Sequence, residues 1–362
     1  MYNIISNINS LLEAVGSDWY SIKRLTINNI LKMPNYSIGI EILIKNLKPY
    51  GYASKSGKPI YFYLDKESAP NNILYRASSN KYDEAFLFSP GERVSQGTAN
   101  VYNKLISDVL PSWKNFPRRN NSVICTNNYS IAEDYTEYSM RRGGVVYIVI
   151  PPDDAQLVIS PRSDIWYAFS YIKSKTGLVS LRNINDSILK FLAFFDNFIN
   201  NQDLINNIYS QTYNMTGLIQ NIRDKELLNI EKYENLFTNV DESSIVAIFN
   251  RIDKLLSDKK FIINLLPIYK TYFLDEPLAA IGNYILNRKK SNVNSTIINI
   301  LDNLFNPSKN GFEVVNYYSF STKEYIDREI WVEDPCIFIE FDSKQFLTKL
   351  YYKYGSLNKT KR

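Results

Sequence analysis

The sequence predicts an α+β protein in which a mostly antiparallel sheet is divided along the chain by a large helical segment. Short apolar and aromatic runs, broken by Gly, Pro and Asn, lie between residues 60 and 161 and return after Pro307. From about residue 183 to 306, apolar residues recur at the three- and four-residue spacing of amphipathic helices. Strands on both sides of a helical block indicate one sheet domain that carries an insertion.

The N-terminal region, residues 1–58, is expected to form a helical cap. Apolar residues at helical spacing predict one helix between Ile4 and Leu12 and a second between Ile22 and Leu31. This cap precedes the first part of the sheet core, which we place at residues 59–181.

Three runs predict strands in that first part of the core. They are Ile60–Leu64, Ile73–Tyr75 and Val145–Ile150, each short and rich in β-branched or aromatic residues. Turn-forming residues separate them, so the chain is expected to fold back repeatedly here.

The helical insertion is expected at residues 182–308. The apolar faces from Ile188 to Ile199 and from Ile245 to Leu256 follow Asn185 and Asp241, which suit N-cap positions.

The second part of the core is expected at residues 309–345, where Val314-Val315 and Cys336–Ile339 are strand-like. Residues 346–362 are expected to form a polar C-terminal tail.

Composition excludes several kinds of chemistry. The chain of 362 residues contains no His, so Ser-His-Asp, Cys-His and His-metal sites are excluded, and we expect no metal. Its two cysteines, Cys125 and Cys336, are too few for a disulfide framework and fit a reducing compartment, so we expect a cytoplasmic protein. Met1 to Leu12 lacks the pattern of a signal peptide, and no apolar run approaches the roughly 20 residues of a membrane helix.

Three separated patches carry the functional signal. They are Leu74–Arg76, Asn121–Asn127 and Asp327–Trp331, and they supply a cation, a hydroxyl-bearing strand and a carboxylate. Cleavage of the bond between nicotinamide and ribose passes through an oxocarbenium-like state, which a carboxylate stabilises. The diphosphate of a dinucleotide is best held by the planar donor fork of Arg. Together the patches therefore favour binding and cleavage of NAD.

The order of these patches resembles the Arg-Ser-Glu class of mono-ADP-ribosyltransferases, which pair an aromatic-Arg dipeptide with a Ser/Thr strand and a late acidic-x-Glu sequence. The stretch from Trp113 to Thr126, followed by Tyr147–Pro151 and Ser163–Trp166, is similar to phage-type proteins associated with that fold. The resemblance covers residues 60–171 and 312–341.

This resemblance implies a split sheet core of ADP-ribosyltransferase type and a glycosyltransferase that uses NAD as co-substrate. The acceptor would be a macromolecule, in particular a protein of a bacterial host, met in the host cytoplasm. Glu329 would stabilise the oxocarbenium-like state, and Asp327 would help to select a cationic acceptor. The residues implied to bind NAD are Tyr75, Arg76, Ser122, Cys125, Thr126 and Asn127.

The chain departs from the family pattern at three places. Cys125-Thr126-Asn127 stands where Ser-Thr-Ser is usual, and Asp327 stands where Glu or Gln is usual. A long segment also separates Asp164 from Glu329, so it must fold on itself.

Other interpretations of the same residues remain open. Taken singly, Arg76 suits a surface residue that forms an ion pair. Thr126 suits a turn, and Glu329 suits a solvent-exposed position on a strand. The chain could be a catalytically inactive phage protein that binds a partner or serves a structural role. It could also bind nucleic acid through a basic cluster, which consists of Lys114, Arg118 and Arg119.

Overall fold

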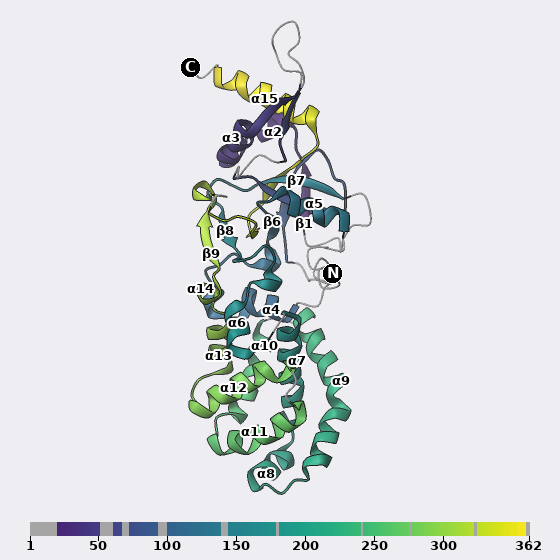
Figure 1. The fold of residues 1–362 in the computed structure, drawn as a ribbon, viewed down its shortest axis with the longest axis vertical. Coiled ribbons are helices and arrows are strands. Elements are labelled where there is room, and N and C mark those ends of the chain that lie inside the picture. The colour runs from purple at the N-terminus through teal and green to yellow at the C-terminus, as the bar shows by residue number, and fades with distance from the viewer. Residues whose placement is uncertain are drawn as a thin grey trace. The chain divides into compact units, whose positions relative to one another are not determined.

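The computed structural model describes two compact units of the chain (Figure 1). The sheet unit contains residues up to 96, 116–165 and 312 onward, and the helical unit contains residues 97–115 and 166–311. The described residues are 20–50, 61–66, 72–92, 100–138, 144–178, 181–239, 242–274, 277–321 and 324–359. The helix expected between Ile4 and Leu12 lies outside them.

The sheet unit is built on a nine-stranded sheet in the order β1-β5-β11-β7-β4-β6-β10-β8-β9, and its neighbouring strands pair antiparallel. Together with the helices, this sheet confirms the predicted α+β class. The strands are β1 (Tyr20–Arg24), β4 (Leu74–Ser78), β5 (Ala85–Pro90), β6 (Val123–Thr126), β7 (Val145–Ile150), β8 (Gln156–Ile159), β9 (Glu313–Asn316), β10 (Glu329–Val332) and β11 (Cys336–Glu340).

Strands from the two ends of the chain alternate within this sheet. β10 lies between β6 and β8, and β11 lies between β5 and β7. The late strands thus complete the early ones, and the sheet cannot form without both parts of the chain.

Side chains alternate across the sheet and fill a core on each face. Ile148 and Ile339 belong to one core, whereas their neighbours Val149 and Phe338 belong to the other. Burial on both faces accounts for the continuous apolar runs in the sequence of β7 and β11.

A second layer covers one face of the sheet. It contains α2 (Ile27–Ile30), α3 (Ser37–Asn46), α15 (Lys344–Lys359) and a separate two-stranded ribbon of β2 (Leu47–Tyr50) and β3 (Tyr61–Leu64). Thr26 starts α2 with a capping box to Asn29.

The expectation of a helix between Ile22 and Leu31 is wrong for its first half. Residues Tyr20–Arg24 form the edge strand β1, which pairs with β5 over five residues. The pairing partner is far away in sequence, so local periodicity could not reveal that a strand would form.

The prediction of a polar tail from residue 346 onward is also wrong for the residues up to Lys359. Residues Lys344–Lys359 form α15, and Phe346, Leu347 and Leu350 on its inner face are buried in the core. These residues recur at helical spacing and bury enough apolar surface to hold the helix in place.

The helical unit contains the expected insertion and extends beyond it at both ends. Trp113 belongs to it, because its indole Nε1 donates to the Phe305 carbonyl at 2.9 Å. In Figure 1, α7 and α9 run side by side, and they make extensive contact. The helices are α4 (Asn100–Lys104), which continues as a π-helix (Leu105–Val109), α6 (Ser170–Thr176), α7 (Leu181–Ile199), α8 (Gln202–Ser210), α9 (Met215–Asn239), α10 (Glu242–Leu255), α11 (Lys259–Phe273), α12 (Ala280–Ser291), α13 (Ile297–Phe305) and α14 (Pro307–Asn310).

Candidate functional site

The sheet register brings together the three residues on which the sequence hypothesis depends. β4, β6 and β10 are consecutive neighbours, with Tyr75 opposite Thr126 and Thr126 opposite Glu329. Arg76 follows Tyr75 on β4. The cation, the hydroxyl and the carboxylate therefore come from three adjacent strands, although they are far apart in the sequence.

β4 and β6 separate directly beyond their point of contact. Their register consists of the single pair Tyr75–Thr126, whereas β4 pairs with β7 along five residues. Arg76 spans the gap, because its Nη1 donates to the Ile124 carbonyl at 2.6 Å. The guanidinium thus supplies a hydrogen bond that a neighbouring strand would otherwise provide.

A small pocket lies at this separation and is covered by α5 (Tyr129–Tyr138). Its volume is about 30 Å³, which is room for water, whereas ligand pockets for drug-sized molecules run to roughly 300 Å³ or more. The pocket is therefore too small to enclose a dinucleotide in this structure. Its lining residues are Tyr75, Arg76, Ala77, Ile124, Cys125, Thr126, Ala132, Tyr135, Ser163 and Glu329.

Glu329 is almost completely buried and both of its carboxylate oxygens are engaged. Arg119 Nε donates to Oε1 at 3.0 Å, and the Ile165 backbone N–H donates to Oε2 at 3.1 Å. Each side chain of the ion pair is 2% exposed. The Arg119 guanidinium also lies 5.9 Å from the centre of the Trp331 ring, two residues beyond Glu329.

Sequence reasoning missed this role of Arg119 and placed it in a basic surface cluster. One feature of the sequence could have indicated this role, because Arg119 lies inside the Trp113–Thr126 stretch, beside the hydroxyl-bearing strand. A buried carboxylate needs a compensating cation, so an Arg close to such a strand was a candidate.

The hydroxyl and amide residues of the second patch have different roles. Thr126 lines the pocket, and its Oγ1 accepts a hydrogen bond from the Asn128 N–H at 3.2 Å. Ser122 is not among the lining residues, and its Oγ donates to the Arg118 carbonyl at 2.7 Å. Asn127 donates to the Tyr325 carbonyl and accepts from the Arg328 N–H, so it fastens the segment before β10.

Asp327 belongs to that fastened segment, outside the lining of the pocket. Its backbone is left-handed, with φ 54°, and its Oδ1 accepts from Asn128 Nδ2 at 2.5 Å. Asp tolerates this conformation better than most residues, because its short polar side chain bonds locally. The structure therefore places Asp327 two residues before Glu329 at an exposed position next to the pocket strands.

Cys125 is a poor nucleophile in these surroundings. Burial raises the pKa of its thiol to about 12, against the opposing effect of the Arg76 charge. Its Sγ donates to the Ile330 carbonyl at 3.3 Å. The thiol thus contributes to packing between β6 and β10.

Two members of the proposed basic cluster are neutralised within the sheet unit. Arg119 pairs with Glu329, and Arg118 pairs with Glu333 at 2.8 Å. Burial raises the pKa of Glu333, but hydrogen bonds from Arg118 and Asn121 outweigh it and leave this pKa below its ordinary value.

Comparison of the chain with known protein families, with curated proteins and with solved structures gave no match. The described part of the chain holds no group of three His, Cys, Asp or Glu side chains placed to bind a metal ion. None of its described helices combines the length and apolar character needed to cross a membrane.

Proposed function

We propose that the sheet unit is an NAD-dependent mono-ADP-ribosyltransferase of the Arg-Ser-Glu type, which transfers ADP-ribose to a macromolecular acceptor such as a bacterial host protein. One observation carries the proposal. Arg76, Thr126 and Glu329, selected from separate motifs, line the same pocket on three adjacent strands.

Each residue has a role that its position can support. The Arg76 guanidinium stands where two strands part and offers planar donors to the NAD diphosphate. Thr126 offers a hydroxyl to the nicotinamide ribose from the strand between Arg76 and Glu329. Glu329 stabilises the positive charge that develops as nicotinamide leaves, and the acceptor nucleophile then forms the new bond to the ribose.

The small volume of the pocket adds a condition to this reaction. Because the volume beside Glu329 is about 30 Å³, binding of the nicotinamide ribose has to be coupled to widening of the pocket. The Arg119–Glu329 pair must loosen in the same step if the carboxylate is to face the substrate.

A second function is favoured by the same ion pair. A catalytically inactive relative that binds a partner or serves in a phage particle would keep this fold and use Glu329 only to balance Arg119. Engagement of both Glu329 oxygens by Arg119 and the Ile165 N–H is the observation that favours this candidate.

The test is incubation of the purified full chain with labelled NAD and a bacterial lysate, compared with Glu329→Gln and Arg119→Gln. Both variants break the buried pair, but only the first removes the carboxylate. Label on a macromolecule that is lost with Glu329→Gln and retained in part with Arg119→Gln supports the transferase. Release of nicotinamide without label would instead assign NAD hydrolysis.

Equal loss with both variants, when each is shown to be folded, would contradict a role for Glu329 beyond the ion pair. Absence of labelling, hydrolysis and NAD binding in the native chain would contradict the transferase and favour the inactive binding protein.

A further inference from the structure

Another hollow lies within the helical unit, and the candidate functional site does not use it. Its volume is about 620 Å³, which falls within the roughly 300 to 1,000 Å³ of pockets that hold small molecules. All of its lining residues belong to the helical unit. The hollow, called the α6–α12 hollow below, is lined by Lys175, Thr176, Gly177, Pro277, Ala280, Asn283, Tyr284, Asn287, Arg288 and Ser291.

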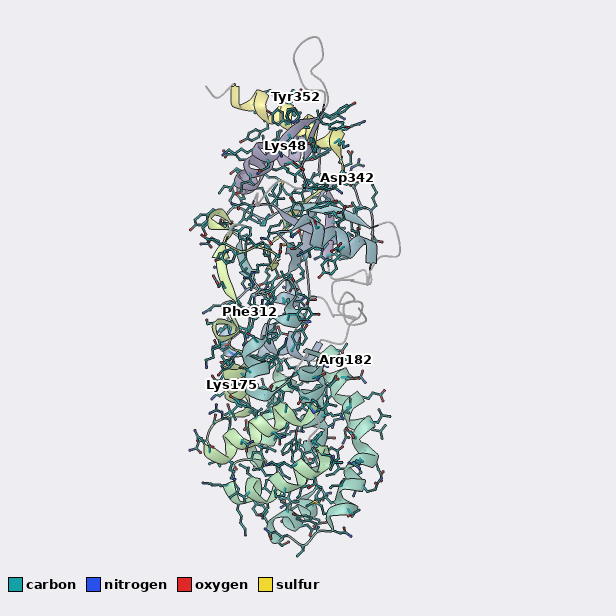
Figure 2. All side chains as sticks on the ribbon, in the orientation of Figure 1. Lys48, Lys175, Arg182, Phe312, Asp342 and Tyr352 are labelled. Carbon is teal, nitrogen blue, oxygen red and sulfur yellow. The ribbon has the colours of Figure 1, made fainter. Side chains whose placement is uncertain are left out.

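One face of α12 forms a wall of the α6–α12 hollow along the whole helix. The lining residues on α12 recur at intervals of three and four from Ala280 to Ser291, so they share one side of the helix. The end of α6 contributes a second wall, and Figure 2 labels Lys175 on its last turn. Amide, hydroxyl and cationic side chains from two helices therefore line the same space.

The described lining carries two cations and no carboxylate. Lys175 and Arg288 come from different helices, and neither forms an ion pair within the described part of the chain. Lys175 Nζ lies 5.6 Å from the centre of the Tyr171 ring, and the Arg288 guanidinium lies 5.2 Å from the centre of the Tyr284 ring. An aromatic ring attracts a cation without neutralising it, so both charges remain available to a ligand.

The helices packed around α6 keep the local charge positive. Lys309 on α14 also lies over the Tyr171 ring, with its Nζ 5.7 Å from the ring centre. α6 packs against α12, α13 and α14, and Asp302 is the one carboxylate residue in these four helices. Its Oδ1 accepts a hydrogen bond from the Ser112 N–H at 2.9 Å. The cations of the hollow therefore meet no counter-charge on these helices.

Two side chains of the α6–α12 hollow have polar atoms without a hydrogen-bond partner. Asn283 Oδ1 and the Tyr284 hydroxyl are shielded from water and bond to nothing in the described part of the chain. Such atoms are rare in folded proteins, because each one costs free energy. A ligand with hydroxyl groups offers a donor to Asn283 and an acceptor to Tyr284. Side chains commonly change rotamer on binding, which brings shielded atoms to a ligand.

A phosphate carried on a sugar matches both the charge and the polar groups of the hollow. Arg288 supplies a planar fork of donors and Lys175 a compact charge, and phosphate oxygens bind well to both. A sugar adds hydroxyl groups, which suit the amides of Asn283 and Asn287 and the hydroxyl of Tyr284.

We propose that the α6–α12 hollow binds a sugar phosphate, whose phosphate is held by Lys175 and Arg288 and whose hydroxyl groups bond to the polar side chains of α12. This proposal does not rest on the transferase activity, because the two sets of residues belong to different units of the chain. The Glu329→Gln variant, confirmed to be folded, is expected to bind the sugar phosphate as the native chain does.

The test is isothermal titration calorimetry of the full chain with ribose 5-phosphate at low ionic strength. Arg288→Gln should weaken binding about tenfold or more and Lys175→Gln about fivefold or more, because each loses a hydrogen bond to a charged group. Both residues are exposed, so the variants should fold, which circular dichroism verifies. Tyr284→Phe should weaken binding without lowering stability, because the hydroxyl it removes has no partner within the described protein.

Lys290 provides the matched control for the charge. It is an exposed lysine in the last turn of α12 and does not line the hollow, so Lys290→Gln should leave the Kd unchanged. Free ribose should not bind, and inorganic phosphate should bind more weakly than ribose 5-phosphate. AMP carries the same phosphorylated sugar, so tighter binding of AMP would assign a nucleotide and weaker binding a free sugar phosphate.

Two carboxylates next to Pro277 in the sequence give a further control. Asp275 and Glu276 lie outside the described residues, and the double variant Asp275→Asn/Glu276→Gln removes their negative charge. It should bind ribose 5-phosphate at least as tightly as the native chain, because an anion gains from a more positive surface. Weaker binding in this variant would contradict an anion site.

Failure of the native chain to bind ribose 5-phosphate would overturn the proposal. Equal weakening by Lys290→Gln and Arg288→Gln would also overturn it, because the attraction would then be general rather than local. Binding of free ribose as tight as that of ribose 5-phosphate would rule out the role of the two cations.

Discussion

Arg119 and Glu329 form an ion pair with Nε and Oε1 3.0 Å apart, and each side chain is only 2% exposed. Two charges have been removed from water here, which is costly unless their attraction and further hydrogen bonds compensate. The Ile165 N–H provides one such bond to the other carboxylate oxygen. The carboxylate of the candidate site is therefore fixed in direction by the fold itself.

Breaking this pair from the Arg119 side is expected to destabilise the protein strongly. Arg119→Met leaves the Glu329 carboxylate buried without its counter-charge, and we expect a loss of about 3 to 5 kcal/mol in the free energy of unfolding. The matched control is Arg118→Met, because Arg118 is 50% exposed in its pair with Glu333 and should cost about 1 kcal/mol or less. Urea unfolding of both variants measures the difference, and equal losses would contradict the buried pair.

The Arg119–Glu329 pair also determines the effect of Glu329→Gln on stability. From the sequence alone, this exchange looks harmless to folding, but the structure predicts that it leaves the Arg119 charge buried and uncompensated. The double variant with Arg119→Gln should recover part of the stability lost by the single variants, because the two residues are coupled. A double-mutant cycle from urea unfolding gives the coupling energy, and simple additivity would contradict direct pairing.

Arg76 is expected to serve both the sheet and the ligand. Arg76→Ala removes the donor to the Ile124 carbonyl, so we expect a loss of about 1 to 3 kcal/mol in stability together with loss of NAD binding. Arg24→Ala is the control, because Arg24 is 78% exposed. Thermal unfolding with and without NAD reports both effects. An Arg76→Ala protein that NAD still stabilises as it does the native chain would remove Arg76 from the ligand site.

Local patterns predicted the elements whose partners lie close in sequence or whose two faces are both buried. The apolar run Val145–Ile150 became β7, and the periodic face from Ile188 to Ile199 lies in α7. The register that joins Thr126 to Glu329 depends on long-range pairing, so only the order of the motifs pointed to it.

The errors have physical causes of the same kind. β1 forms because its residues pair with the distant strand β5, and no local sequence pattern reveals that pairing. The burial of Arg119 depends on Glu329, and a charged residue looks like a surface residue in a sequence. The apolar face of α15, by contrast, was visible at Phe346, Leu347 and Leu350 and could have been predicted.

Two helical glycines should respond oppositely to Ala. A Cβ at Gly282 in α12 would overlap the ring and hydroxyl of the buried Tyr269 and lie 2.9 Å from Phe191 Cδ2. Gly282→Ala is therefore expected to cost about 1 to 3 kcal/mol or more. At Gly355 in α15 a Cβ meets nothing within 4 Å, so Gly355→Ala should stabilise by about 0.5 to 1 kcal/mol. Circular dichroism melts of both variants give the sign, and stabilisation by Gly282→Ala would show that α11 and α12 pack less closely.

The two cysteines should be unreactive in the folded protein. Burial raises the pKa of Cys125 to about 12, and burial also raises the pKa of Cys336 well above its ordinary value. At pH 8 only about one Cys125 thiol in ten thousand would then be ionised, and the thiolate is the reactive form. We therefore expect an aromatic disulfide reagent to label neither cysteine in the native chain and both in denaturant.

The rate of that labelling also tests the packing of β6 against β10. Reaction of Cys125 requires local opening of these strands, so its rate should rise in the Arg119→Met variant, which weakens the contact beside it. A Cys336→Ser background isolates Cys125, and the exposed-pair variant Arg118→Met serves as the control. Rapid labelling of the native chain, or equal rates in the two Arg variants, would mean that the buried pair does not hold the pocket strands together.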